Sequence, residues 1–242
     1  MIVEEIVKRG SGHLISEIHD KIAWIVFNNP DRMNAMSKDM WDSSANLLDK
    51  YASDSNVRAI VLTGAGERAF VAGADISEFV GMDSKETKLK FTDNAVESLW
   101  SLTKPTIAMI DGFALGGGCE VACSCDIRIA SERSKFGTPE INLGLIPGYG
   151  ATQRLAKLVG YGKTLEMVMT GEMISASEAR NIGLVNHVCD HEKLSDFTMN
   201  IANKIASKSV YTLKTAKRIW GWATRKGKNS HRINGRTKRK IL

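Results

Sequence analysis

The chain has 242 residues, of which 43% are hydrophobic and 25% charged, a balance that indicates a folded globular protein and excludes a disordered chain. No apolar run reaches the roughly 20 residues that a membrane-spanning helix needs. The first residues also lack the basic start and apolar stretch of a signal peptide, so a cytoplasmic protein is expected.

The net charge of +6 is concentrated at one end of the sequence. Residues 217–242 contain ten of the 33 lysine and arginine residues and no acidic residue, which leaves 23 basic against 27 acidic side chains in the preceding 216 residues. The sequence is therefore an acidic globule with a basic tail. Its pI of about 9.1 does not by itself predict a nucleic-acid binder.

The four cysteines do not predict a disulfide framework, because the chain is large and shows no secretion signal. Three of them are expected to be small buried side chains: Cys119, Cys123 and Cys125. The fourth belongs to an alternating segment, His187, Cys189 and His191, which would place three ligand-type side chains on one face of a strand. A strand end that runs into a surface turn explains this segment more simply, and we predict no metal site.

The first half of the chain alternates between short strands and helices. Residues 13–28 alternate apolar and polar side chains around a turn at 19–21, which predicts a β-hairpin. A helix is expected over residues 37–53 with Ser37 as its cap. The next expected elements are a strand at 57–63, a helix at 85–102 that stops before Pro105, and a strand at 106–110.

The second half continues the same alternation. A helix is expected to begin near residue 118, and a capping box at residues 175–178 predicts another helix that ends near Gly183. The other expected elements are strands at 125–130, 134–137 and 184–188 and helices at 160–170, from 194 through 205, and from about 211. Strands grouped in twos with a helix after each group predict an α/β fold built of ββα units.

Residues 69–76, Ala-Phe-Val-Ala-Gly-Ala-Asp-Ile, combine small side chains with the start of a helix. Small residues let a ligand approach the backbone, and the amides of a helix start favour negative charge. A tight strand-to-helix turn without a ligand remains an alternative for this segment alone.

Residues 112–120, Gly-Phe-Ala-Leu-Gly-Gly-Gly-Cys-Glu, place three consecutive glycines before a helix. This arrangement suits a backbone amide aimed at a developing oxyanion. The spacing matches neither a dinucleotide fingerprint nor a P-loop. Cys119 is a weak candidate nucleophile, because the nearest histidines in the sequence that could serve as its base are His187 and His191.

Glu140 lies between proline and apolar residues, and a second loop rich in glycine and proline follows it. A carboxyl group beside apolar surface should have a raised pKa and be a better proton donor near neutrality. The residues alone thus indicate two oxyanion-type loops and two candidate carboxylates, Glu120 and Glu140.

Four segments together resemble the signature series of the crotonase (enoyl-CoA hydratase/isomerase) family. They are Ala-Gly-Ala-Asp-Ile, Gly-Phe-Ala-Leu-Gly-Gly-Gly-Cys-Glu, Phe-Gly-Thr-Pro-Glu and Ile-Pro-Gly-Tyr-Gly-Ala-Thr-Gln-Arg-Leu. They occur in the order and at the spacing of that family, and the resemblance covers about residues 12–218. It implies a crotonase-like spiral of ββα units with a core over residues 1–195 and a C-terminal helical region over 196–242.

The resemblance also implies a function: hydration of 2-trans-enoyl-CoA to 3-hydroxyacyl-CoA. The amides of Ala74 and Gly117 would form the oxyanion hole, Glu140 would pass a proton to the α-carbon, and Glu120 would activate the water. The substrate would be held by Arg32, Met33, Ala35, Arg68, Ala72, Asp75, Ile76 and Gly148. No cofactor is implied, since coenzyme A is part of the substrate, and the expected assembly is a homotrimer or hexamer if the altered C-terminus permits it.

The sequence departs from the family at three places. Ala151 stands where glycine is usual, and Ser77 stands where many members carry a lysine for the CoA phosphates. From about residue 220 the basic tail replaces the amphipathic helices that usually end the chain, and we expect impaired assembly or CoA binding. An enoyl-CoA isomerase and a non-catalytic RNA-binding homologue that acts through the tail remain alternatives.

Overall fold

The hairpin that begins the predicted fold is present in the computed structural model, which describes residues 2–79 and 95–225. Strands β1 (Leu14–His19) and β2 (Ile22–Phe27) pair antiparallel. Asp20 and Lys21 between them both have positive φ, which is the turn geometry that matches the twist of two paired strands. A short helix that the sequence did not predict, α1 (Ile2–Arg9), precedes the hairpin.

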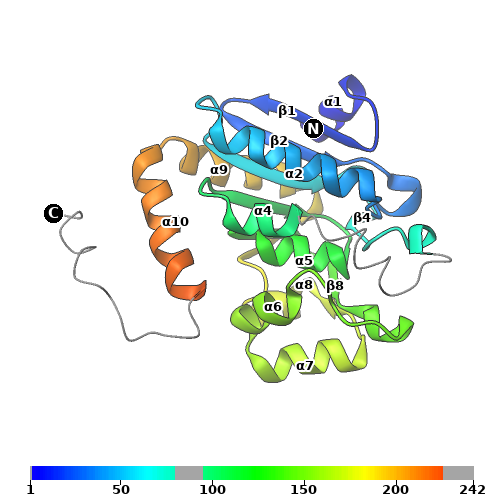
Figure 1. Cartoon of the computed structure of the whole chain (residues 1–242). Coiled ribbons are helices and arrows are strands. Elements are labelled where there is room, and N and C mark those ends of the chain that lie inside the picture. Colours follow the sequence, from blue (N-terminus) through cyan, green and yellow to red (C-terminus); the bar gives the residue numbers. More distant parts are fainter. Residues whose placement is uncertain (1, 80–94, 226–242) are drawn as a thin grey trace.

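Helix α2 (Lys38–Ser53) confirms the helix predicted at residues 37–53. The Ser37 side chain accepts a hydrogen bond from the Met40 amide, so Ser37 is the predicted cap. Met40, Trp41 and Leu48 form part of its buried face. Figure 1 shows α2 lying across the sheet next to the hairpin.

The remaining strands form two sheets. The larger sheet has the order β1-β2-β3-β5-β7-β10 and contains β3 (Ala59–Gly64), β5 (Thr106–Ile110), β7 (Ile127–Ser131) and β10 (His187–Cys189). The smaller sheet has the order β4-β6-β8-β9 and contains β4 (Ala69–Val71), β6 (Phe113–Leu115), β8 (Lys135–Gly137) and β9 (Ile174–Ser175). Successive pairs β3β4, β5β6 and β7β8 each give one strand to each sheet, which confirms the predicted ββα pattern.

Helices follow and cover these strands. They are α4 (Ala95–Ser101), α5 (Gly117–Ser124), α6 (Ala151–Val159), α7 (Tyr161–Thr170), α8 (Ala176–Asn181), α9 (Leu194–Ala206) and α10 (Val210–Arg225). Four 3-10 helices complete the described part: η1 (Pro30–Arg32), η2 (Ile76–Phe79), η3 (Pro139–Leu143) and η4 (His191–Lys193). Within the described residues, none of the helices has the length and apolar character needed to cross a bilayer.

The larger sheet is buried on both faces. Along β2, alternate side chains enter two different apolar clusters, with Ile25 and Phe27 in one and Trp24 and Val26 in the other. Helices α2, α4 and α5 contribute to the first cluster, whereas α1 and α9 cover the second. Strands β2, β3 and β5 are apolar along nearly their whole length, as is usual for strands buried on both faces. The alternation of apolar and polar side chains predicted for residues 13–28 therefore does not extend through β2.

Some element boundaries differ from the predictions. The strand predicted at 184–188 is only β10 (His187–Cys189): the Val185 amide donates to the Ala179 carbonyl of α8, and the register with β7 begins at His187. The sequence missed α6 and the two- and three-residue strands β4, β6 and β9. The helix predicted at 85–102 is present as α4 (Ala95–Ser101), and its expected start lies outside the described residues.

The start of the basic tail is part of the folded body. Lys217 on α10 pairs with Asp126 at 2.7 Å between nitrogen and oxygen, and it donates to the Lys104 carbonyl. The Lys104 ammonium in turn donates to the carbonyls of Tyr51 and Asp54 at the end of α2. Residues 226–242, which hold most of the predicted tail, lie outside the described residues.

Candidate active site

A cleft of about 560 Å³ lies where the segment after β4, the start of α5 and the loop after η3 meet. Its lining residues are Ala72, Gly73, Ala74, Ile76, Gly116, Gly117, Glu120, Pro139, Glu140, Leu143, Leu145, Ile146, Gly148 and Tyr149. Both predicted catalytic glutamates and both predicted oxyanion residues are therefore in one cavity. The lining is otherwise mostly apolar, as is usual for a small-molecule site.

Ala74 and Gly117 are brought side by side by the backbone. Ala74 forms a bridge with Met36, in which the Met36 amide donates to the Gly73 carbonyl and the Asp75 amide donates to the Met36 carbonyl. Gly117 is the first residue of α5, so its N–H is one of those that a helix start leaves without a partner inside the helix. A Cβ placed on Gly117 would lie 3.8 Å from the Ala74 nitrogen.

Two neighbouring glycines make this approach possible. Gly116 has φ of +53°, a conformation that favours glycine. A Cβ on Gly118 would lie 1.9 Å from the Val71 carbonyl oxygen, so α5 and β4 touch backbone to backbone. The run of three glycines thus serves the close packing of a helix start against a strand end.

Glu120 is a buried carboxylate on α5, and only 1% of it is exposed. One of its oxygens, Oε1, accepts hydrogen bonds from the amides of Tyr149 (2.7 Å) and Ala151 (2.9 Å). The pKa of Glu120 is raised to about 7: burial is the largest cause, the negative charge of Glu140 adds to it, and the two backbone hydrogen bonds oppose both effects. A group that titrates near neutrality is suited to exchange protons there.

Glu140 lies in η3 and is half-buried. Burial raises the pKa of its carboxyl group, as the apolar neighbours in the sequence predicted. Its Oε2 atom is buried without a hydrogen-bond partner in the described part of the chain. A Cβ on Gly116 would lie 3.4 Å from its other oxygen, Oε1, so Glu140 faces the glycines before α5.

Tyr149 is a lining residue that the sequence did not single out. It comes from the loop after η3, packs its ring on Trp41 of α2, and also supplies an amide to Glu120. Nothing in the local sequence pattern links residue 149 to residue 41. The segment around residue 149 was interpreted as a loop rich in glycine and proline, and its tyrosine was given no role.

The residues predicted to hold the substrate divide into two groups. Ala72, Ile76 and Gly148 line the cleft, whereas Arg32, Met33, Ala35, Arg68 and Asp75 do not. Arg32 pairs with Asp75 at 2.6 Å and also donates to the Ser77 hydroxyl. The Ser77 hydroxyl donates to Asp75 and lowers the pKa of that carboxyl. Arg32 is exposed and contacts Ser77, so it places a cation beside the position where many family members carry a lysine.

Ala151, the other departure near the site, is fully buried and is not among the residues that line the cleft. Its contribution to the site is its amide, which donates to Glu120. Its methyl group is therefore not part of the cleft wall.

Cys119, Cys123 and Cys125 are all buried, which confirms the prediction made for these three cysteines. A hydrogen bond with Cys123 and burial both raise the pKa of Cys119 well above its usual range. A thiol that resists ionisation is a poor nucleophile, and this argues against the cysteine hypothesis.

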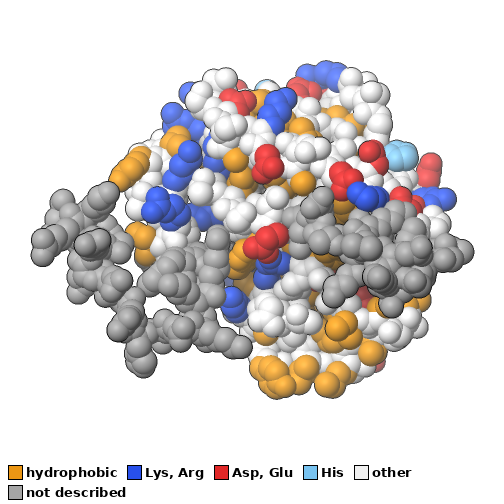
Figure 2. Space-filling view, in the orientation of Figure 1, with side chains coloured by type: hydrophobic (Ala, Val, Ile, Leu, Met, Phe, Trp, Pro, Cys, Tyr) orange, Lys and Arg blue, Asp and Glu red, His pale blue; other side chains and the backbone are white. Residues whose placement is uncertain are grey.

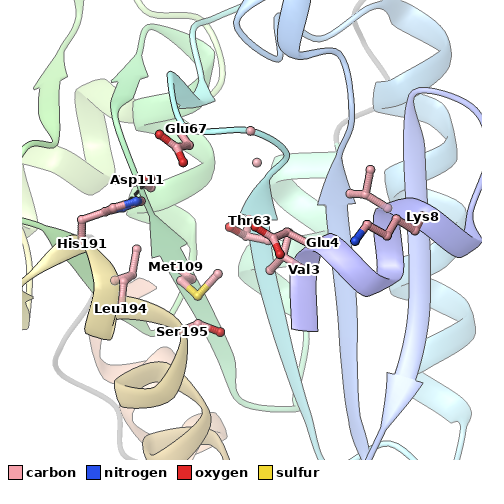
Figure 3. A pocket seen from close by; sticks show the side chains of 13 residues that line it. Val3, Glu4, Lys8, Thr63, Glu67, Met109, Asp111, His191, Leu194 and Ser195 are labelled. Atoms are coloured by element: carbon pink, nitrogen blue, oxygen red, sulfur yellow. Dashed lines mark ion pairs between the residues drawn. The ribbon is translucent and has the colours of Figure 1, made fainter. Parts of the chain in front are cut away.

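A second cavity, of about 270 Å³, lies between α1, the ends of β3 and β5, and α9 (Figure 3). His191 and Asp111 line this cavity, and the His191 Nδ1 atom lies 3.0 Å from the Asp111 carboxylate. Outside the cavity, the His187 ring packs against Phe197 and the Cys189 thiol faces the Ala130 carbonyl. The three side chains of the alternating segment thus have different partners. In the described ranges, no group of three or more potential metal ligands gathers.

A family model described as enoyl-CoA hydratase/isomerase matches residues 17–237. The short-chain-enoyl-CoA hydratase of Clostridium acetobutylicum is 45% identical over 207 residues, which cover 85% of this chain and 79% of that protein. The crotonyl-CoA hydratase of Syntrophomonas wolfei is 39% identical over 85% of this chain and 80% of its own length.

This chain belongs to the enoyl-CoA hydratase/isomerase family. Membership confirms the resemblance read from the four sequence segments. The fold agrees: the crystal structure of an enoyl-CoA hydratase from Bacillus anthracis superimposes with a TM-score of 0.83 at 35% identity, over 89% of this chain and 88% of that one. The crotonase-like spiral of ββα units predicted from the sequence is thus the fold of the family.

Proposed function

We propose that this protein hydrates 2-trans-enoyl-CoA thioesters to 3-hydroxyacyl-CoA, with Glu120 and Glu140 as its catalytic residues. The observation that carries the proposal is the placement of two carboxyl groups of raised pKa in the same cleft as the backbone of Ala74 and Gly117. Membership of the family supports the choice of reaction.

In the proposed reaction the thioester oxygen accepts hydrogen bonds from the amides of Ala74 and Gly117. These amides stabilise the negative charge that develops on this oxygen when water attacks the β-carbon. Ionised Glu120 takes a proton from the attacking water, and protonated Glu140 gives a proton to the α-carbon. One water is added, the carbon–carbon double bond is consumed, and the thioester stays intact.

A short acyl chain is the substrate class that we favour. The two relatives described above are named for short-chain and crotonyl substrates. The CoA moiety would extend from the cleft past Ala72 and Ile76 towards Arg32, with Met33, Ala35, Arg68 and Asp75 beside it. Gly148 would contact the substrate inside the cleft. Neither a metal nor a separate cofactor takes part in this scheme.

Assembly into a homotrimer or hexamer remains part of the proposal. Apolar side chains are exposed on η3, on the loop after it, and on and after α7: Ile141, Leu143, Leu145, Ile146, Met169 and Met173. Figure 2 shows orange side chains gathered at the lower end of the molecule, over α7. Exposed apolar surface is typical of ligand grooves and of contacts with another chain. Leu143, Leu145 and Ile146 also line the cleft, so Ile141, Met169 and Met173 are the residues that support an assembly contact. The division at residue 195 and a cytoplasmic location stay predictions.

The direct test follows the loss of ultraviolet absorbance of the conjugated thioester when the full chain meets crotonyl-CoA. We expect rapid loss that both Glu120→Gln and Glu140→Gln abolish or reduce by at least about 10², the scale of general acid–base catalysis. Product analysis on 2-enoyl and 3-enoyl substrates separates hydration from isomerisation. A folded protein that converts 3-enoyl-CoA but adds no water would overturn the proposal in favour of an isomerase.

RNA binding through the tail is the competing function of another class. Removal of residues 220–242 should abolish RNA binding if it occurs, whereas the charge of the tail should not matter to chemistry in the cleft. No observation in the described residues favours this alternative, since Lys217, the first residue of the basic tail, already pairs with Asp126.

A further inference from the structure

Arg154 is a buried cation on α6, next to the active-site loop. Only 8% of its side chain is exposed. Its Nη1 atom donates to the Tyr149 carbonyl at 2.6 Å, and its Nη2 atom donates to Glu97 of α4 at 2.6 Å. Its guanidinium carbon lies 5.0 Å from the centre of the Trp100 ring. A buried arginine with such specific partners has little conformational freedom.

These contacts connect Arg154 to Glu120 through one residue. The Tyr149 N–H donates to Glu120, and the Tyr149 C=O accepts from Arg154. The following residue, Gly150, has φ of +98°, and a Cβ on it would lie 2.1 Å from Arg154 Nη1. The loop that supplies both amides to Glu120 is therefore held on its other side by the guanidinium group.

The charge of Arg154 also acts on Glu120. It favours the ionised carboxylate and so opposes the effect of burial on the pKa of Glu120. The other ionisable groups around Glu120 are Glu140, whose charge raises that pKa, the buried thiols of Cys119 and Cys123, and the Tyr149 phenol. Among the described groups that change the pKa of Glu120, Arg154 is the one that carries a positive charge.

We propose that Arg154 is a positioning residue, oriented by Glu97, that holds the Tyr149–Ala151 loop in the conformation whose amides fix Glu120. Arg154 does not touch the cleft, so it acts through the loop and through its charge. The catalytic consequence rests on the proposed function. The effect on Glu120 itself does not, because it concerns the protonation of a carboxyl group that is observable without turnover.

Three variants separate the two contributions. Arg154→Gln removes the charge and shortens the side chain, Arg154→Lys keeps the charge but loses the fork of donors, and Glu97→Gln weakens the orientation of Arg154. Lys157→Gln is the matched control, because it removes a cation from the same helix near the same Trp100 ring, at 5.9 Å from its centre. Circular dichroism and thermal unfolding establish that each variant is folded.

With crotonyl-CoA as substrate, we expect Arg154→Gln to lower kcat by about 10- to 100-fold, since misplacement of a catalytic group has effects of this size, with KM changed less than kcat. Arg154→Lys should recover part of the loss, Glu97→Gln should show a smaller loss, and Lys157→Gln should behave as the unmodified protein. The acidic limb of the pH profile should move to higher pH in Arg154→Gln.

Titration of carbon-13-labelled glutamate carboxyl groups by NMR tests the proposal without activity, with Glu120→Gln to assign the resonance. Arg154→Gln should raise the pKa of Glu120, and Lys157→Gln should leave it unchanged. If the unmodified protein proves inactive while this pKa still moves, the function proposed above fails and the positioning role stands. A folded Arg154→Gln with unchanged kcat and unchanged Glu120 titration overturns the positioning role. If Arg154→Gln does not fold, the same two measurements, kcat and the Glu120 titration, are made on Arg154→Lys and Glu97→Gln. Both unchanged in these folded variants would overturn the positioning role.

Discussion

The indole ring of Trp41 stacks on the ring of Tyr149, with centroids 5.0 Å apart and planes 23° apart. Tyr149 lines the cleft, whereas Trp41 lies behind it on α2 and is buried. The Trp41 ring also lies 3.3 Å from the point where a Cβ on Gly117 would be. One aromatic side chain therefore supports both the loop that binds Glu120 and the residue proposed for the oxyanion hole.

Replacement of Trp41 by alanine should affect stability and catalysis together. Loss of a buried Trp side chain costs about 3–5 kcal/mol of unfolding free energy. Chemical denaturation should show this loss, and kcat on crotonyl-CoA should fall because Tyr149 loses its support. Trp41→Phe, which keeps a ring at the contact, should retain most of both. An alanine variant with unchanged kcat would mean that the stack has no part in positioning.

The pH dependence of kcat/KM should be bell-shaped. The proposed reaction needs Glu120 ionised and Glu140 protonated, and the pKa of Glu120 is raised to about 7. Activity should rise as the first of the two carboxyl groups ionises and fall at higher pH as the second loses its proton, because the reaction needs one ionised and one protonated group. Because the two carboxyl groups interact, the two apparent pKa values belong to the pair. A profile that is flat between pH 5 and 9 would exclude this assignment of roles.

Glu120→Gln should change how stability depends on pH. Because folding raises the pKa of Glu120 from 4.5 to about 7, the folded state holds a proton that the unfolded state loses over this range. The stability linked to Glu120 is therefore fully present below pH 4.5 and is lost as pH rises through 7. The loss is on the order of 3 kcal/mol. The glutamine variant, which cannot ionise, should gain stability relative to the parent as pH rises from 5 to 8.

Urea unfolding at several pH values measures this difference. Carboxyl groups that do not interact with Glu120, such as Asp75 with its lowered pKa, contribute equally to both proteins and cancel in the comparison. The measured difference therefore reports Glu120 together with its coupling to Glu140. A difference in stability that stays constant from pH 5 to 8 would show that the pKa of Glu120 is not raised.

Gly118→Ala should prevent or strongly impair folding, since its Cβ would meet the Val71 carbonyl oxygen at 1.9 Å. Backbone atoms on both sides leave no flexible group that could move away. Gly162→Ala on α7 is the control, because a Cβ there meets nothing within 4 Å and alanine favours a helix by roughly 1 kcal/mol. The comparison needs soluble yield and thermal midpoints. Equal midpoints for the two variants would contradict the close contact of α5 with β4.

The sequence predicts the elements whose patterns are long enough to read. The hairpin, α2 and α9 span six or more residues per element and carry clear periodicity or a cap. Strands β4, β6 and β9 have two or three residues, which is too short for any period. Helix α6 was missed because the glycine and proline residues before it indicated a loop, whereas Gly150 is in fact the cap of a helix that begins at Ala151.

The candidate site is predictable to a similar degree. Glu120 and Glu140 stand beside glycine and proline segments, and the family resemblance gave each a role. Tyr149 and Arg154 act through partners far away in the sequence, Trp41 and Glu97, and no local pattern reports such contacts. Their functions became visible only when the fold had placed α2, α4 and α6 around one loop.

The division of each strand pair between the two sheets has a consequence for the order in which the site matures. Ala74 follows β4, Gly117 follows β6, and the amides that hold Glu120 follow β8, so three successive turns of the spiral must stack before these groups meet. A chain still being synthesised has no working centre until residue 151 has left the ribosome and the turn that contains β8 has docked on the two before it. The appearance of turnover during refolding would therefore time the closure of the spiral rather than the formation of any single helix or strand.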